Sequence, residues 1–215
     1  NLGAPSLEIS PLALTSSLSN LIHKAFYPQN GPVHFNAPFR EPLEETKIEI
    51  PKEYLNLAHV IINNNSPSTT YLELETRLSN NALAKIAKII NHSKTGLLVI
   101  GSLSPYDDLS ELKSLIAKLN WPTYLDVSSC LKFEYNLNDN TIPTFDHPEV
   151  QNELNNNPPE TVFHIGGRLT SKHYYSFLKS NPQINLITLN KNIEKEDPSH
   201  HTKYRLNASI NPTLN

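Results

Sequence analysis

Three basic side chains follow a strand-like run late in the sequence and could bind an anion together. Arg168, Lys172 and His173 lie within the stretch TVFHIGGRLTSKHYYSFL, Thr161–Leu178. Ligands of open α/β sheets bind beyond the carboxyl ends of the strands, where helix N-termini offer free N–H donors and the positive end of a dipole. Fixed cations in this setting predict a site for an anion such as a carboxylate.

The neighbouring residues indicate the elements that would hold these cations. Thr161–Ile165 is typical of a buried strand, Gly166 and Gly167 predict a tight turn, and a helix is expected to begin near Thr170. The alternative is that the glycines only reverse the chain and that the cations are solvated, because structural turns of this kind outnumber binding sites.

Nucleotide-binding motifs are weak or absent in this sequence. After the apolar run Leu97–Ile100 the chain reads GSLSPYD, with a single glycine and with Asp107 and Asp108 close to the expected helix start. These carboxylates would repel a pyrophosphate. The sequence also lacks the GxxxxGK[ST] pattern of a P-loop. The pattern therefore argues against a nucleotide site at this turn.

Other residue types with chemical potential have simpler interpretations. His200 and His201 are adjacent, and adjacent side chains in a strand would point to opposite faces. No cysteine lies close in the sequence and Asp197 is the nearby carboxylate, so we do not predict a metal site. Ser128–Cys130 follows an expected strand but lacks the GxSxG pattern of a nucleophile, so these residues are expected to cap or turn the chain. Asp126 is expected to be an N-cap or turn residue.

Composition limits the function classes. The chain has 215 residues, 38% of them hydrophobic, and a formal net charge of −3, so no basic surface indicates nucleic acid as a partner. No apolar run approaches the roughly 18 residues of a membrane span. The single cysteine, Cys130, fits a reducing, cytoplasmic environment. Because the chain lacks methionine and closes on NASINPTLN without an evident helix or strand, we expect a segment of a longer polypeptide.

Apolar periodicity predicts an α/β fold: a three-layer, Rossmann-like domain with a mainly parallel central sheet. We expect the strands Leu97–Gly101 and Thr161–Ile165 to be central and almost fully buried. Helices are expected over 11–27, 78–91, from Ser104-Pro105 to Leu119, and over 148–154; further strands are expected at 33–37, 58–62, 123–127, 184–189 and 203–206.

Four ordered segments resemble one family of thiamine-diphosphate enzymes. They are GPVHFNAPFREPL (Gly31–Leu43), NWPTYLDVSS (Asn120–Ser129), GGRLTSKHY (Gly166–Tyr174) and DPSHHTKYRL (Asp197–Leu206). The family is 2-succinyl-5-enolpyruvyl-6-hydroxy-3-cyclohexene-1-carboxylate synthase of menaquinone biosynthesis, often called MenD. The resemblance spans most of the chain, although residues 47–93 carry little of it.

The resemblance implies a three-domain enzyme of which this chain is a part. Residues 1–42 would be the tail of the pyrimidine-binding domain with a linker, residues 43–207 the middle domain, and residues 208–215 a linker to the diphosphate-binding domain. The complete family enzyme uses thiamine diphosphate and Mg²⁺ to decarboxylate 2-oxoglutarate, adds the resulting carbanion to isochorismate, and assembles as a dimer or tetramer. The motifs that contact the cofactor lie in the other two domains, so we expect the segment alone to bind no cofactor or metal, to contain no catalytic residue and to be inactive.

The resemblance also implies roles for residues of the loop 166–173. Lys172 falls on a family lysine that binds isochorismate, and it is expected to project from the carboxyl edge of the sheet. His173 stands where some members have arginine, and histidine is shorter and mostly neutral at pH 7. Two alternatives stay open: an independent module that binds a small molecule such as a nucleotide, and a spacer domain that contacts no substrate.

Overall fold

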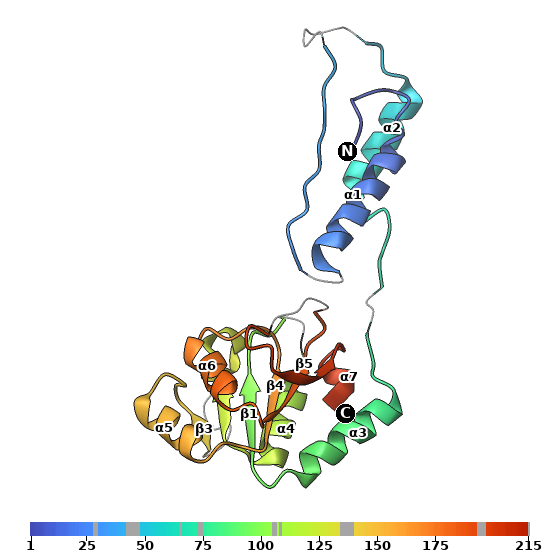
Figure 1. The fold of residues 1–215 in the computed structure, drawn as a ribbon. Coiled ribbons are helices and arrows are strands. Elements are labelled where there is room, and N and C mark those ends of the chain that lie inside the picture. Colours follow the sequence, from blue (N-terminus) through green and yellow to red (C-terminus); the bar gives the residue numbers. More distant parts are fainter. Residues whose placement is uncertain are drawn as a thin grey trace. The chain divides into compact units, whose positions relative to one another are not determined.

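The chain forms two compact units, Asn1–Leu74 and Glu75–Asn215 (Figure 1). The computed structural model describes residues 1–27, 30–41, 48–64, 66–72, 75–104, 107, 109–133, 140–192 and 197–214. No helix in these ranges is both long enough and apolar enough to cross a membrane.

The first unit consists of two helices that pack against each other, α1 (Pro11–Phe26) and α2 (Lys52–Asn63). Helix α1 begins as predicted, because Ser10 Oγ accepts a hydrogen bond from the Leu12 N–H and proline occupies the first helical position. Neither helix has a buried residue. This unit therefore lacks a closed core of its own within its described residues.

Two predicted strands of the first unit are wrong. Ala58–Ile62 lies inside α2, because the partly buried residues Tyr54, Ala58 and Ile61 recur at helical spacing. Val33–Ala37 forms no strand in the described part of the unit, where Asn36 accepts one backbone hydrogen bond, from Leu2 N–H at 2.9 Å. An apolar run becomes a strand only where a neighbouring strand satisfies its backbone groups.

The second unit is built on a six-stranded sheet in the order β3-β2-β1-β4-β5-β6, and every neighbouring pair is parallel. The predicted α/β class with a parallel sheet is confirmed. The two-residue strand β3 was not predicted, and β2 is shorter than expected because Asp126 ends it. The strands are β1 (Gly96–Ile100), β2 (Thr123–Leu125), β3 (Thr141–Ile142), β4 (Thr161–Ile165), β5 (Asn185–Leu189) and β6 (Thr202–Leu206).

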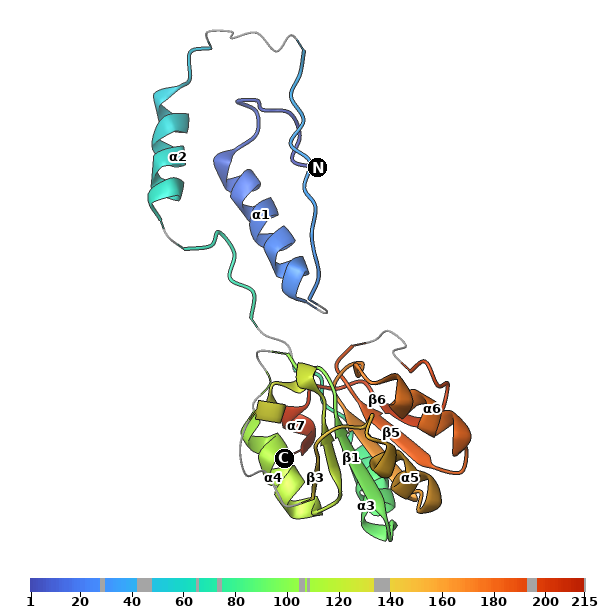
Figure 2. The same ribbon diagram turned by 90° about the vertical axis from the view of Figure 1, so that its left-hand side faces the viewer.

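Helices cover both faces of this sheet and complete the three layers (Figures 1 and 2). Side chains of β1 alternate between the faces: Leu98 and Ile100 share one core with α3, α4 and α7, whereas Leu97 and Val99 share the other with α5 and α6. Both β1 and β4 are buried along their whole length, as predicted. The helices are α3 (Asn80–His92), α4 (Leu109–Leu119), α5 (Pro148–Asn156), α6 (Lys172–Ser180) and α7 (Asn211–Leu214).

Two local predictions for the second unit are corrected. Helix α4 begins at Leu109 rather than beside Ser104. In the segment before it, Asp107 accepts a 2.7 Å hydrogen bond from the Ser104 N–H, and Pro105 and Asp108 lie outside the described residues. The chain also closes on a helix, α7, contrary to expectation. Ala208 and Ile210 are buried just before it, so apolar packing rather than helix propensity orders this end.

Candidate functional site

The loop that follows β4 lies directly on the end of β1. Gly101 N–H donates to the Ile165 carbonyl and Gly167 N–H donates to the Ser102 carbonyl, both at 2.8 Å. A Cβ on Gly101 would overlap the Gly167 carbonyl, and Gly166 adopts φ +89°, which L side chains rarely adopt. Glycine is therefore required at both positions, and the loop is held against the sheet.

This contact fills the switch point of the sheet. The strand order reverses between β1 and β4, which is where doubly wound sheets bind ligands. A pyrophosphate at this position must approach the glycine after β1, but the Gly167 carbonyl already lies over Gly101. The geometry therefore disfavours a nucleotide between β1 and β4.

His164 connects the loop to helix α6. The ring is 7% exposed, with Nε2 at 2.9 Å from the Gly167 carbonyl and Nδ1 at 3.1 Å from the Tyr174 hydroxyl. A carbonyl only accepts, so Nε2 carries the hydrogen and Nδ1 accepts from Tyr174. Burial lowers the pKa of His164 to about 4, so the ring is neutral at pH 7.

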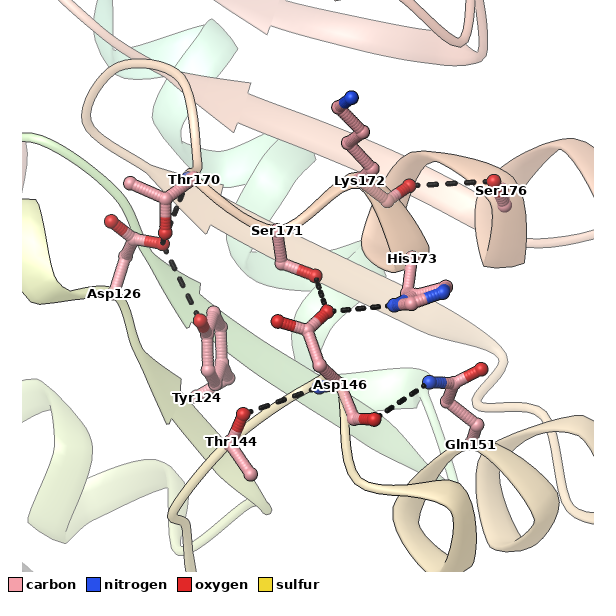
Figure 3. Close-up of polar contacts among 10 residues, drawn as sticks. All are labelled: Tyr124, Asp126, Thr144, Asp146, Gln151, Thr170, Ser171, Lys172, His173 and Ser176. Atoms are coloured by element: carbon pink, nitrogen blue, oxygen red, sulfur yellow. Dashed lines mark hydrogen bonds and ion pairs between the residues drawn. The ribbon is translucent and has the colours of Figure 1, made fainter.

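Asp126 holds the far end of the same loop (Figure 3). Its Oδ1 accepts from Ser128 N–H at 3.0 Å and Ser128 Oγ at 2.6 Å, which confirms the predicted N-cap role. Its Oδ2 accepts from Thr170 N–H at 3.0 Å and Thr170 Oγ1 at 2.8 Å. Burial alone would raise the pKa of Asp126, but these hydrogen bonds lower it below its usual value. The buried carboxylate is therefore ionised at neutral pH.

A second carboxylate, Asp146, lies at the start of helix α6. Its Oδ1 accepts from Ser171 Oγ at 2.6 Å and pairs with His173 Nδ1 at 2.8 Å (Figure 3). The hydrogen bond from Ser171, followed by that from His173, lowers the pKa of Asp146. The positive end of a helix favours a negative charge. A carboxylate of the protein itself thus occupies part of the predicted anion site.

The structure places the three predicted site residues differently from one another. Lys172 is the first residue of α6, is exposed, and points away from Asp146 (Figure 3). Arg168 is also exposed, and it lies near the Tyr175 hydroxyl. Burial raises the pKa of Tyr175, and the charge of Arg168 partly offsets this increase. His173 is engaged with Asp146 instead of presenting a free ring. Lys172 is therefore the strongest candidate of the three.

Asp146 was the residue that sequence reasoning missed. It stands directly before His147-Pro148, the N-cap and first residue of α5, so the only available signal was an acidic residue at a helix start. Nothing in that pattern indicates a partner on α6. Its contact with His173 joins residues 27 positions apart and depends on how the loops are arranged in space.

The carboxylate of Asp197 accepts hydrogen bonds only from residues of its own turn among the described contacts, unlike Asp126 and Asp146. It accepts hydrogen bonds from Ser199 N–H and Oγ, His201 N–H, and Thr202 N–H and Oγ1. Strand β6 begins only at Thr202, and His200 adopts φ +57°. The two histidines therefore precede the strand, so the alternation of strand faces does not apply to them, whereas the strand predicted at 203–206 is confirmed. Within the described ranges, no three His, Cys, Asp or Glu side chains lie close enough together to hold a metal ion.

A pocket lies between α6 and the carboxyl ends of β5 and β6. The pocket opens to solvent, and Tyr175, Thr188, Asn190 and Arg205 are among its lining residues. Arg205 is engaged there, because it donates to the Asn192 carbonyl at 2.9 Å. Lys172 does not line this pocket, so a ligand in the pocket and a ligand on Lys172 are separable hypotheses.

Comparisons with known proteins agree with the fold and the sequence motifs. Residues 57–215 match the family model described as "Middle domain of thiamine pyrophosphate". The 2-succinyl-5-enolpyruvyl-6-hydroxy-3-cyclohexene-1-carboxylate synthase of Syntrophus aciditrophicus (strain SB) is 32% identical over 205 residues, which are 94% of this chain and 34% of that protein. "Protein PHYLLO, chloroplastic" of Arabidopsis thaliana is 27% identical over 98% of this chain and 13% of its own length.

A solved structure, "X-ray structure of a putative thiamin diphosphate-dependent enzyme isolated from Mycobacterium smegmatis", has a TM-score of 0.44 and 14% identity over 70% of this chain and 29% of that one. The chain spans about a third of the length of the curated synthases it matches. The resemblance to the synthase family is confirmed, and the chain belongs to the family of middle domains of thiamine pyrophosphate enzymes.

Proposed function

We propose that this chain is the middle-domain segment of a thiamine-diphosphate-dependent synthase that decarboxylates 2-oxoglutarate and adds the carbanion to isochorismate. In this proposal the middle domain holds the catalytic domains apart, and Lys172 binds a carboxylate of isochorismate. Residues 1–42 would belong to the pyrimidine-binding domain and residues 43–207 to the middle domain. Residues 208–215 were expected to be a linker, but Ala208 and Ile210 are buried in the core, so in this proposal the described residues up to Leu214 belong to the middle domain. The complete enzyme would be a cytoplasmic dimer or tetramer.

The exposed ammonium of Lys172 at a helix N-terminus carries this proposal. A cation is unfavourable at this end of a helix, and residues that break a local rule without compensation are candidates for function. The loop before Lys172 is held by Asp126, by Gly101 and by the His164 bridge. Because the backbone of this loop is already held in place, a charged group on it can orient a substrate carboxylate at a smaller loss of conformational entropy.

In this proposal the cofactor lies outside this chain, as the family resemblance implies. The part of the chain that the structure describes contains no three-ligand acidic or histidine cluster for Mg²⁺, and the Gly167 carbonyl closes the switch point to a diphosphate. We therefore assign thiamine diphosphate and Mg²⁺ to the other domains of the complete enzyme. The role proposed for this chain is to bind and orient isochorismate.

Replacement of Lys172 in the complete enzyme tests the proposal. Lys172→Ala should raise the KM for isochorismate about ten- to a hundredfold, because a hydrogen bond to a charged group contributes roughly 1.5–3 kcal/mol. The KM for 2-oxoglutarate should change less than about twofold. Lys179→Ala, an exposed lysine in the last turn of the same helix, is the matched control. Equal effects of the two substitutions, or none from either, would favour a spacer domain.

The pocket beside β5 and β6 supports a second candidate, a module that binds a small molecule such as a nucleotide. Its aromatic and cationic lining suits such a ligand. The lining carboxylate Asp197 would repel phosphates: burial alone would raise its pKa, but hydrogen bonds from Ser199 and Thr202 hold that pKa far below its usual value. Calorimetric titration of the chain with ADP separates the candidates. Micromolar binding that Arg205→Ala abolishes would favour the nucleotide module.

A further inference from the structure

A buried carboxylate joins the Lys172 loop to a different part of the sheet. Asp126 follows β2, Thr170 lies in the loop after β4, and 44 residues separate them in the sequence. Strand β1 lies between β2 and β4, so the contact spans the end of a third strand. The exposed fraction of Asp126 is 0%. The start of α6 is thus attached to β2 by a charge that solvent does not reach.

The two carboxylate oxygens of Asp126 accept hydrogen bonds from two different segments of the chain. Oδ1 accepts both bonds from Ser128 and completes the local turn, whereas Oδ2 accepts both bonds from Thr170. Tyr124 contributes a longer contact to Oδ2, at 3.4 Å. The carboxylate of Asp197, in contrast, receives its bonds from residues two to five positions away. A turn can therefore be completed by an aspartate without any distant partner.

We propose that Asp126 is a positioning residue for substrate binding, acting on Lys172 through Thr170; this rests on the proposed function. Thr170 precedes Lys172 by two residues, and Ser171 between them is buried. The position of Thr170 therefore helps to set the direction in which α6 leaves the loop, together with the contacts of Asp146 to Ser171 and His173. Small displacements of a group that orients a substrate produce large losses of rate or affinity. Asp126 does not touch the substrate in this scheme.

Two substitutions in the complete enzyme weaken the contact from either side. Thr170→Val keeps the size of the side chain and removes the Oγ1 donor, and it should raise the KM for isochorismate roughly three- to tenfold. Asp126→Asn replaces one carboxylate oxygen, on which two donors converge, by an amide NH2 group that cannot accept. We expect it to raise the KM for isochorismate more than Thr170→Val does. Ser128→Ala is the control, because it perturbs the same carboxylate on the Oδ1 side and should change the KM less than about twofold. The KM for 2-oxoglutarate should stay within about twofold throughout.

A double-mutant cycle with Lys172→Ala decides whether Asp126 acts through the lysine. In the Lys172→Ala background, Thr170→Val should add less than about twofold to the KM for isochorismate, because the group it positions is gone. Effects that multiply fully would overturn the positioning role while leaving the proposed function intact. If Lys172→Ala has no effect in the first place, the proposed function itself fails.

Hydrogen exchange of the 215-residue chain supplies a readout that does not depend on activity. The amide at position 170 donates to Asp126 Oδ2, so Thr170→Val and Asp126→Asn should speed its exchange at least about tenfold, and Ser128→Ala should not. Faster exchange without a change in the KM for isochorismate would show that the contact is only structural and would overturn the inference. Unchanged exchange would show that the carboxylate does not hold the loop.

Discussion

The two units of the chain differ in how their elements are stabilised. Every buried hydrophobic residue among the described ones lies in the second unit, Glu75–Asn215. Helices of the first unit instead leave large apolar side chains in solvent, such as Ile22 at 59% exposed and Ile62 at 74%. Helices close their own hydrogen bonds, so caps and periodicity can define α1 and α2 locally. Strands need neighbours, and Val33–Ala37 accordingly stays unpaired in the described first unit while β1 and β4 form.

The largest expected difference between the units is in the free energy of unfolding after an Ile→Ala substitution in each. Ile100→Ala removes a side chain with 0% exposure from the end of β1 and should lower the free energy of unfolding by roughly 2–5 kcal/mol. Ile62→Ala in α2 should change it by less than about 0.5 kcal/mol. Denaturant titration followed by fluorescence of Trp121, the single tryptophan, reports on the second unit because Trp121 packs against its core. A loss near zero for Ile100→Ala would mean that β1 is not central.

The second unit, which contains His164, should also lose stability at acidic pH, and this loss should distinguish it from the first unit. The pKa of His164 falls to about 4 on folding, so the unfolded state binds a proton that the folded state does not. Stability should therefore fall as the pH drops from about 6.5 to about 4, by about 3 kcal/mol in all. His164→Gln, which keeps a donor for the Gly167 carbonyl, should flatten this slope in denaturant titrations at several pH values. An unchanged slope would assign the loss to other groups.

The smallest contrast compares two helix caps of the same chemistry. Ser79 Oγ accepts from the Ala82 N–H in the second unit, and Ser10 Oγ accepts from the Leu12 N–H in the first, both at 3.3 Å. Ser79→Ala should lower the unfolding free energy reported by Trp121 by about 1 kcal/mol. Ser10→Ala should reduce only the helical circular dichroism of the chain. If Ser10→Ala shifts the Trp121 transition as much as Ser79→Ala, the two units unfold together.

Much of the fold follows from short-range patterns. Continuous apolar runs predicted β1 and β4, Ser10-Pro11 predicted the start of α1, and the glycine turn predicted that Lys172 lies in the first turn of α6. Four motifs also predicted the family that the comparisons confirm. These signals succeed because caps, turns and hydrophobic periodicity act over a few residues.

The candidate site was only partly predictable, for the opposite reason. Sequence reasoning found the Lys172 loop and the capping role of Asp126, but neither Asp146 nor the contacts that hold the loop. Asp126 meets Thr170 across 44 residues, and Asp146 meets His173 across 27. The order of the parallel strands brings these loops together, and neither residue carries a local mark of its distant partner. The sequence by itself determined the central strands β1 and β4, the helix α1 and the place of Lys172 in the first turn of α6. Tertiary structure decided which carboxylates hold the loop, because only the closed sheet brings their donors within hydrogen-bond distance.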